Sequence, residues 1–436
     1  MADATVSMAS GGPLGLDPAI AAELLADPGL WRDFNDICDC GGRLAGTESE
    51  KRAFALLRER VRAASPANSG RSIPVPYGGW RAKRAFLRLP DGSLAACHPL
   101  VRTIATPPQG LTAEVIDLGR GTPEEFEAHA AEIGGRIVLV RHELMFAAGT
   151  IHRRRKYDAA RARGAAGFLI AGPLLGHVVA GSSGRQAGDG IPALGIAPET
   201  AARLARRAKG YPTVTMTIET EEGPAETETL LYDYPGRTGE WVVLSAHVDG
   251  HDLAESAMDN GTGLASVLAV TRALAPHVAG FRRGLRVMFF SVEEWALTGS
   301  AQYVESLGEA ERRRIALNVN LDSVAGSPNL AALTSGFGGV EPFVLDVAEA
   351  NGLGVRTVRP LMTNSDHANF AQAGIPALRL VAGFDDPAAN LRLVLTPADT
   401  RDKIGQGELR TATIFTAALV AAACNADPAE VERWRS

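Results

Sequence analysis

The sequence predicts an α/β fold in which helices flank a central, mostly parallel mixed sheet. The run at 241–246 is almost entirely apolar, without the alternation that a half-exposed strand shows, and two further strand-like apolar runs lie at 285–292 and 315–322. Strands that are apolar throughout are typical of a parallel sheet, which is covered on both faces. An apolar helix is predicted from Leu264 to Leu274, between the first two runs.

Further helices are predicted at both ends of the chain. Residues 17–35 and 48–64 are predicted to be helical, and the second segment carries apolar residues at helical spacing. Thr47 is suited to cap that helix because its hydroxyl can accept a hydrogen bond from a free backbone amide. The longest apolar stretch, at 412–424, is shorter than the roughly 20 residues that cross a bilayer. It is therefore interpreted as a buried terminal helix.

The middle of the chain has a β/α pattern of its own, which predicts an inserted domain at 109–210. Residues 213–222 and 226–236 are then expected to form paired antiparallel strands that return to the main sheet. Glu221 to Pro224 supply the predicted turn between them. The predicted domains are 1–108, the first part of the main domain; 109–210, the insert; and 211–436, the rest of the main domain.

Polar residues that can bind metals appear where the apolar strands end or just before an apolar helix. Ligands of open α/β sheets bind at the carboxyl ends of the strands. Neutral imidazole and carboxylate oxygens suit zinc, and a carboxylate has two oxygens with which to bridge two ions. The residues in question are His247, Asp259, Glu293, Glu294 and Asp322.

The spacing of these residues suggests separate roles. His247 and Asp249 are two apart, so in an extended segment they share a face, and the carboxylate can orient the imidazole. Adjacent Glu293 and Glu294 point in different directions, so one can bind metal while the other stays free as a general base. An isolated Glu pair more often faces solvent, and only the ordered set favours the functional interpretation.

Several motifs resemble the successive blocks of the co-catalytic zinc exopeptidases, metallopeptidase family twenty-eight, which includes bacterial leucyl aminopeptidases and carboxypeptidase Q. These motifs are HVD, MDNGTG, VEEWALTGS, NLDS and SDHANF. GGRLAGTESEKRA, from residue 41, resembles the family's first block, and TPADTRDKI, at 396–404, its last. The insert resembles the protease-associated domain that some members carry.

The resemblance implies a fold and a set of residue roles. It implies that His247, Asp259 and Asp322 hold one metal ion, and that Asp259 and Glu294 hold a second. Glu293 would be the general base, and Asp249 would orient His247. The family also implies a cis peptide bond between Asp259 and Asn260, and an insert that covers the metal cleft and restricts substrate length.

One departure from the family pattern bears on the number of ions. The family's closing block begins with a histidine that completes the second site, whereas this chain has Leu395 before Thr396. Zinc sites usually have three or more protein ligands. We therefore expect one zinc ion, or two if another residue supplies the missing ligand. The candidates for that replacement are His251, His367, Asp385 and Asp386, with His251 and His367 as alternative outer-sphere groups.

The predicted function is a metal-dependent, aminopeptidase-like hydrolysis of an amide bond in a small peptide or acyl-amino compound. Asn390 and Arg392 are candidates for substrate recognition. Two alternatives remain: a non-catalytic relative that serves as a binding or assembly protein, and an aminoacyl cyclase with one zinc ion. Retention of Glu293 favours an enzyme, because a binding protein has no need of a free carboxylate beside a metal.

The bulk properties indicate a globular protein with several domains. A net charge of −6 argues against nucleic acid as a partner, and the basic run at 151–163 is interpreted as a solvated helix face. The amino terminus lacks the features of a secretory signal. We expect a cytoplasmic protein with reduced cysteines and no membrane partner. A homodimer is an alternative to a monomer, because relatives with the insert are often dimers.

Overall fold

In the computed structural model, the three apolar runs form the centre of the main sheet as β9 (Trp241–His247), β10 (Gly284–Phe290) and β11 (Ile315–Leu321). The structure describes residues 14–185, 188–206 and 210–436. Within these, β9 pairs in parallel with β10 on one side and β11 on the other. The predicted mostly parallel sheet is confirmed, because antiparallel pairs occur only towards its edges.

Beyond β11 the sheet continues through β14 (Ala377–Ala382), β12 (Leu330–Leu333) and β13 (Val355–Val358). β11 pairs in parallel with β14 and β12 with β13, whereas β12 and β14 are antiparallel. Side chains along β9 alternate between two cores. Val242 and Leu244 pack in one hydrophobic cluster, and Val243 packs in another on the opposite face.

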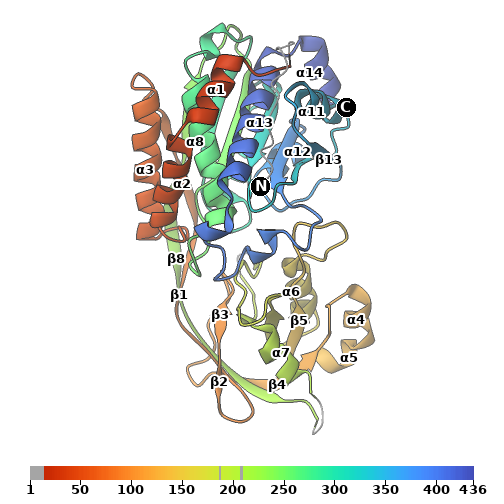
Figure 1. Ribbon diagram of the computed structural model, residues 1–436. Helices are drawn as coiled ribbons and strands as arrows, with labels where there is room; N and C mark the ends of the chain where they lie inside the picture. Colours follow the sequence, from red (N-terminus) through yellow and green to blue (C-terminus); the bar gives the residue numbers. More distant parts are fainter. Residues whose placement is uncertain (1–13, 186–187, 207–209) are drawn as a thin grey trace, which may run out of the picture.

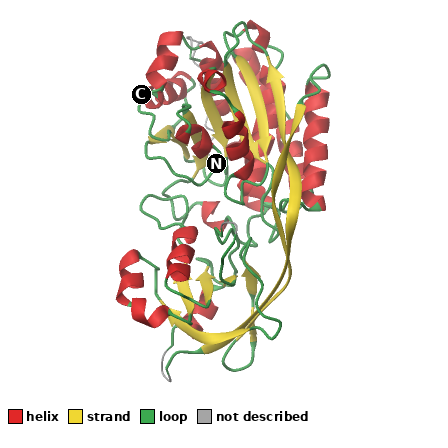
Figure 2. Cartoon of the chain, turned by 180° about the vertical axis from the view of Figure 1, so that it is seen from behind, coloured by secondary structure: helices red, strands yellow, loops and turns green. Residues whose placement is uncertain are grey.

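Helices cover both faces of this sheet (Figure 1, Figure 2). One layer contains α8 (Gly263–Leu274) and α13 (Gln406–Asn425), which pack against each other and against β9. On this side lie also α1 (Pro18–Ala26), α2 (Gly29–Asp39), α3 (Glu48–Ala64), α11 (Val340–Ala350) and α14 (Pro428–Trp434). The opposite face packs against α9 (Thr298–Ser306) and α12 (His367–Gln372), with α10 (Glu309–Arg313) beside β11.

The predicted first helix is two helices, because residues 17–35 include Pro28, which begins a new helix at Gly29. The prediction for 48–64 is confirmed, since α3 has these bounds and the hydroxyl of Thr47 accepts from the amide of Glu50. Residues 1–13 of the first predicted domain lie outside the described residues.

A long two-stranded ribbon connects the main lobe with the insert (Figure 2). It consists of β1 (Arg71–Arg88) and β8 (Thr213–Tyr234), which are antiparallel from Arg71↔Leu231 to Arg88↔Thr215. The predicted turn at 221–224 is therefore wrong, because one continuous strand runs through these residues. Gly78 and Gly79 of β1 lie opposite Pro224 and Gly223, so the turn-forming residues of both strands meet within the ladder.

The insert forms the smaller lobe at the far end of the ribbon (Figure 1). Its strands are β3 (Cys97–Pro99), β4 (Leu111–Asp117), β5 (Ile137–Arg141), β6 (Gly167–Ala171) and β7 (Ala193–Ile196), with β2 (Leu94–Ala95) on the edge of β1. β4 to β7 are parallel neighbours. Its helices are α4 (Pro123–Ala128), α5 (Ala130–Ile133), α6 (Arg153–Ala162) and α7 (Pro198–Leu204).

The carboxyl-terminal apolar segment is longer than the sequence suggested. Within the described part of the chain, α13 is the one helix whose length and composition would allow it to cross a membrane. The expectation of too short a segment is wrong, because the helix begins six residues earlier, at Gln406, and has 20 residues. It packs between α8 and α11 and carries a largely buried surface, in keeping with the predicted core helix.

Candidate active site

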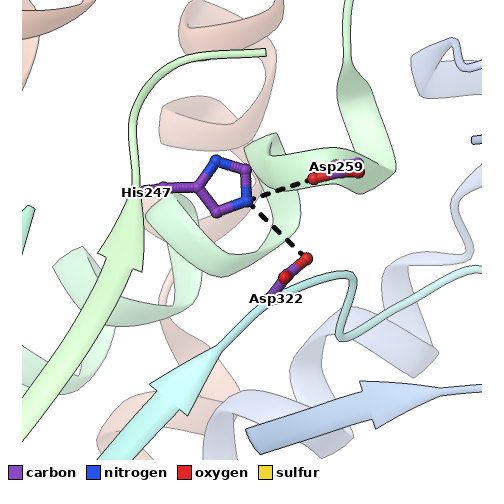
Figure 3. A group of neighbouring side chains, drawn as sticks. All are labelled: His247, Asp259 and Asp322. Atoms are coloured by element: carbon purple, nitrogen blue, oxygen red, sulfur yellow. Dashed lines mark ion pairs between the residues drawn. The ribbon is translucent and has the colours of Figure 1, made fainter. Parts of the chain in front are cut away.

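Three of the predicted metal ligands converge at the carboxyl edge of the main sheet (Figure 3). His247 is the last residue of β9, Asp322 directly follows β11, and Asp259 lies in the π-helical segment η1 (Ala257–Thr262). Nε2 of His247 is 3.1 Å from Oδ1 of Asp259 and 3.7 Å from Oδ1 of Asp322. One ligand atom of each residue lies within 4.8 Å of the other two, which is close enough for one ion to contact all three.

Glu293 and Glu294 follow β10, and their positions depend on Asp249. Oδ1 of Asp249 accepts a hydrogen bond from the amide of Glu293, and Oδ2 accepts one from the amide of Glu294, both at 3.1 Å. Nδ1 of His247 bonds instead to the backbone carbonyl of Asp249 at 2.9 Å, while the Asp249 carboxylate is 3.9 Å away. The backbone of Asp249 thus contacts the imidazole directly, its carboxylate lies at ion-pair distance, and the orienting role of that carboxylate stays a prediction.

Arg379 holds Asp322 in place from the neighbouring strand β14. Its Nη2 is 3.1 Å from Oδ2 of Asp322, and both side chains are almost fully buried. This leaves Oδ1 of Asp322 facing His247. The sequence analysis missed Arg379. A charged residue inside the apolar run ALRLVA was the available signal, because arginine is rarely buried without a partner.

The loop that carries Asp259 is fixed from two directions. Asp399, in the closing block, accepts hydrogen bonds from the amides of Met258 at 2.7 Å and Asp259 at 3.4 Å. The side chain of Asn260 donates to the carbonyl of Leu321, at the end of β11. The peptide bond between Asp259 and Asn260 is cis, as the family resemblance implied.

The electrostatics of this centre favour a cation. Burial lowers the pKa of His247, but Glu293, Asp259 and Asp322 outweigh it and hold that pKa well above its usual range. Burial would raise the pKa of Asp322, but Arg379 and His247 hold it well below its usual range. An imidazole that retains its proton in a buried site lies in a strongly negative potential, which a divalent ion would neutralise.

The two glutamates differ in their proton affinity. Burial, together with the neighbouring Glu294, raises the pKa of Glu293 well above its usual range, against the opposing effect of His247. Burial also acts to raise the pKa of Glu294, but His251 outweighs it and lowers that pKa. A raised pKa suits a general base that must take and return a proton near neutral pH. A carboxylate that stays ionised suits a metal ligand.

A cleft of about 320 Å³ opens above these residues, between the main lobe and the insert. It is lined by the metal-site residues Asp259, Glu293, Glu294 and Asp322, and by Leu395, Thr363, Asn364, Asn369 and Gln372 of the main lobe. The insert contributes Met145, Phe146, His152, Arg153, Arg154, Ser182 and Gly184. The insert therefore forms one wall of the cleft above the predicted metal site.

Arg153, on the insert side of the cleft, is a buried charged residue. The run at 151–163 was interpreted as a solvated helix face, which is wrong for Arg153 and Lys156 because both are buried. Nε of Arg153 donates to the carbonyl of Ser182, and Nη1 lies 3.3 Å from His142. Burial lowers the pKa of Arg153 to about 10, against the opposing effect of Glu294, so the side chain stays charged at neutral pH.

The four candidates to replace the missing histidine ligand differ in what their side chains contact. Nε2 of His251 lies 2.7 Å from Oε2 of Glu294. His367 lies on α12; burial and the charge of Arg379 lower its pKa to about 3, and it does not line the cleft. Asp385 accepts a hydrogen bond from the amide of Ala148, and Asp386 accepts one from the amide of Ala388. These two aspartates stabilise loops.

The residues suggested for substrate recognition lie elsewhere. The side chain of Asn390 donates to the carbonyl of Lys403, and that of Arg392 donates to the carbonyl of Ala388. Both belong to the short helix η3 (Asn390–Leu393), and neither lines the cleft. Asn390 thus bonds to the segment around Lys403 and Arg392 to its own loop, and their role in substrate recognition stays a prediction.

The fold and the site define an α/β protein of the zinc-exopeptidase type with an inserted domain. Residues 229–420 match the model of peptidase family M28, and residues 98–204 match that of the PA domain. The second range overlaps the predicted insert, 109–210. The main lobe is thus similar to peptidase family M28 and the insert to the PA domain, as the motifs indicated.

Individual proteins show the same similarity. The chain is 28% identical to the probable lipoprotein aminopeptidase LpqL of Mycobacterium tuberculosis over 79% of this chain and 70% of that protein. It is 26% identical to aminopeptidase YwaD of Bacillus subtilis over 86% of this chain and 81% of that protein.

Two solved structures share the fold along nearly the whole chain. A zinc aminopeptidase from Bacillus subtilis superposes with a TM-score of 0.72 at 23% identity, covering 90% of this chain and 94% of that one. A peptidase M28 precursor from Shewanella amazonensis gives a TM-score of 0.77 at 21% identity, covering 94% and 96%.

Proposed function

We propose that the protein is a zinc-dependent, aminopeptidase-like hydrolase that cleaves an amide bond of a small peptide or acyl-amino compound. The observation that carries the proposal is the convergence of His247, Asp259 and Asp322 on one point, with Glu293 beside them in the same cleft. The names of the relatives, two aminopeptidases and a zinc aminopeptidase structure, support the reaction class and the metal.

The donor set fits zinc. One imidazole nitrogen and two carboxylates are a common zinc set with room for a water or substrate, and the negative potential at His247 favours a cation there. A zinc ion held by these residues would lower the pKa of a bound water to about 7 and polarise the carbonyl of the amide. Arg379 keeps Asp322 ionised and oriented for this task.

The protein's own residues would then move the proton. Glu293 lies within the cleft and has a raised pKa, so its carboxylate can take a proton from the attacking water and pass it to the leaving nitrogen. Asp249 acts as a positioning residue, because it binds the amide of Glu293 rather than substrate. Arg153, from the insert, places a positive charge on the cleft wall, where it can interact with a carbonyl or carboxylate oxygen of a substrate.

The decisive experiment replaces Glu293 with Gln in the full-length protein. We expect aminoacyl and peptide amides to be cleaved by the wild type, and kcat to fall by about 10²- to 10⁴-fold in Glu293→Gln with the zinc content unchanged. Glu305→Gln, an exposed glutamate on α9, is the matched control.

Unchanged hydrolysis in Glu293→Gln would refute the proposed mechanism. A wild-type protein that holds zinc but cleaves none of these amides would instead favour the alternative, a binding or assembly protein. The cytoplasmic location and the absence of nucleic-acid and membrane partners remain predictions, as does the choice between monomer and homodimer.

A further inference from the structure

Leu395 occupies the place where the resemblance leads one to expect a metal-binding histidine. It lines the same cleft as Asp259 and Glu294, and it is 4% exposed. Its carbonyl accepts a hydrogen bond from the amide of Ala180 in the insert. An aliphatic side chain cannot bind a metal, so the two carboxylates opposite it need a donor from another part of the chain.

His251 points its imidazole at the carboxylate of Glu294. The residue is 4% exposed, and Nε2 lies 2.7 Å from Oε2 of Glu294. Among the described residues, Nδ1 of His251 and the second carboxylate oxygen, Oε1 of Glu294, have no hydrogen-bond partner. Buried polar atoms are normally paired, so a group of them facing one another indicates that something else satisfies them.

The charges around His251 are those of a cation site. The imidazole lies against the carboxylate of Glu294, and the negative charge of Asp259 also acts on it. Asp259 lies 3.1 Å from His247 and lines the same cleft as Glu294. A carboxylate in this position can bridge two ions, because each of its oxygens can bind one.

The loop that carries His251 is held by contacts from the first block and from within the loop. Arg43, in the first block, donates to the carbonyls of Val248, Glu255 and Ser256, so it fastens both ends of the loop. The hydroxyl of Ser256 accepts from the amide of His251 and donates to its carbonyl. A Cβ atom on Gly42 would lie 1.9 Å from the carbonyl oxygen of His251, so only glycine fits there.

We infer that His251 replaces the missing histidine and is the third protein ligand of a second metal ion, together with Asp259 and Glu294. The inference rests on the metal centre of the proposed function and extends it from one ion to two. The second site is then complete in its number of protein donors, although the closing block contributes none. The orienting task falls to Arg43 and Ser256, which hold the backbone on either side of the imidazole.

A competing arrangement involves Arg153. Its charge acts on both Glu294 and His251, so the guanidinium could balance Glu294 in place of a second ion. The two arrangements differ in stoichiometry. A second ion gives two zinc ions per chain, whereas neutralisation by Arg153 gives one.

The test uses the full-length protein, stripped with a chelator and titrated with zinc while binding is followed by calorimetry and elemental analysis. We expect two ions per chain for the wild type. For His251→Ala we expect one ion, with the second site weakened by more than about 100-fold, because loss of an outer-sphere partner alone costs 10- to 100-fold. His277→Ala, an exposed histidine, is the matched control and should retain both ions.

A double variant tests whether His251→Ala loses the ion only because it fails to fold. His251→Ala combined with Leu395→His returns a histidine to the other wall of the same cleft and should restore the second ion. Anomalous diffraction at the zinc edge provides an independent check, with a peak about 2.0–2.1 Å from a nitrogen of residue 251 in the wild type.

One zinc ion per chain in the wild type, two in His251→Ala, or a second zinc peak out of reach of residue 251 would each overturn the inference. None of these measurements depends on hydrolysis. An active enzyme with a single ion would refute the role of His251 and leave the proposed function intact. Two ions in a protein that cleaves no amide would refute the function and leave the ligand assignment intact.

Discussion

Replacement of Asp249 tests how the centre is organised. Its two carboxylate oxygens accept hydrogen bonds from the consecutive amides of Glu293 and Glu294, each at 3.1 Å. Its side chain is fully buried, so water cannot replace either bond. Burial raises the pKa of Asp249 to about 7, against the opposing charge of His247. The residue therefore fixes the general base and a ligand of the proposed second site together.

The magnitude follows from these two bonds. A hydrogen bond to a charged group contributes about 1.5–3 kcal/mol, so Asp249→Ala removes roughly 3–6 kcal/mol of support for the loop. Asp249→Asn keeps one acceptor oxygen, so it removes roughly half of this free energy, about 1.5–3 kcal/mol. If the loss appears in the transition state, kcat falls by roughly 10- to 150-fold in the Asn variant and by more than about 150-fold in the Ala variant.

The assay is steady-state hydrolysis combined with zinc binding. Because Nδ1 of His247 bonds to the backbone carbonyl of Asp249, the ion held by His247, Asp259 and Asp322 should keep its affinity in both variants. Asp252→Asn, in the same loop but with a half-exposed side chain, is the control. If Asp249→Ala instead loses the ion bound by His247, the carboxylate of Asp249 orients the imidazole, and the reasoning from the two backbone amides is refuted.

Further predictions concern the insert and the metal. Lys156 is fully buried and its Nζ lies 2.6 Å from a carboxylate oxygen of Glu143. Glu143→Gln leaves this charge unpaired and should lower the free energy of unfolding in urea by about 3–5 kcal/mol. Adding Lys156→Met removes the unpaired charge and should recover much of the loss. Burial acts to raise the pKa of Glu143, but Lys156 and Arg120 outweigh it and lower that pKa. The wild type should therefore keep this stability above the ordinary glutamate pKa and lose it as pH falls through the lowered value. Glu143→Gln should lack this acid-dependent loss, and a wild type that also lacks it would contradict the prediction. Chelation should abolish activity and lower Tm, and zinc at 100 times its Kd should restore about 2.7 kcal/mol of stability; a Tm that ignores zinc would argue against the site.

The sequence predicted the catalytic edge of the sheet well because its signals are local. His247 and Asp322 follow apolar runs whose burial fixes where each strand ends, so their convergence follows from parallel pairing. The contacts that orient these residues were not predictable in this way. Arg379 reaches Asp322 from a strand 57 residues later in the chain, and no local pattern indicates such a pairing.

Two errors arose from applying local rules where tertiary pairing decides. Residues 221–224 have the composition of a turn, yet β8 continues through them because β1 satisfies its backbone along the whole length. The basic run at 151–163 has the composition of a solvated helix face, yet Arg153 is buried against other segments of the insert, where it contacts Ser182 and His142. In both cases the deciding neighbour is distant in the sequence.

The ribbon that joins the lobes has a consequence for solubility. Among the described strands only β2 and β8 pair with β1, so much of one edge of an 18-residue strand lacks a strand neighbour. Such an edge is a template for sheet extension between molecules. Pro74 and Pro76 remove backbone donors from it, and the ion pairs that Arg81, Lys83 and Arg84 form with glutamates of β8 keep it charged and hydrophilic. The same strand that carries the insert is thereby protected from intermolecular pairing.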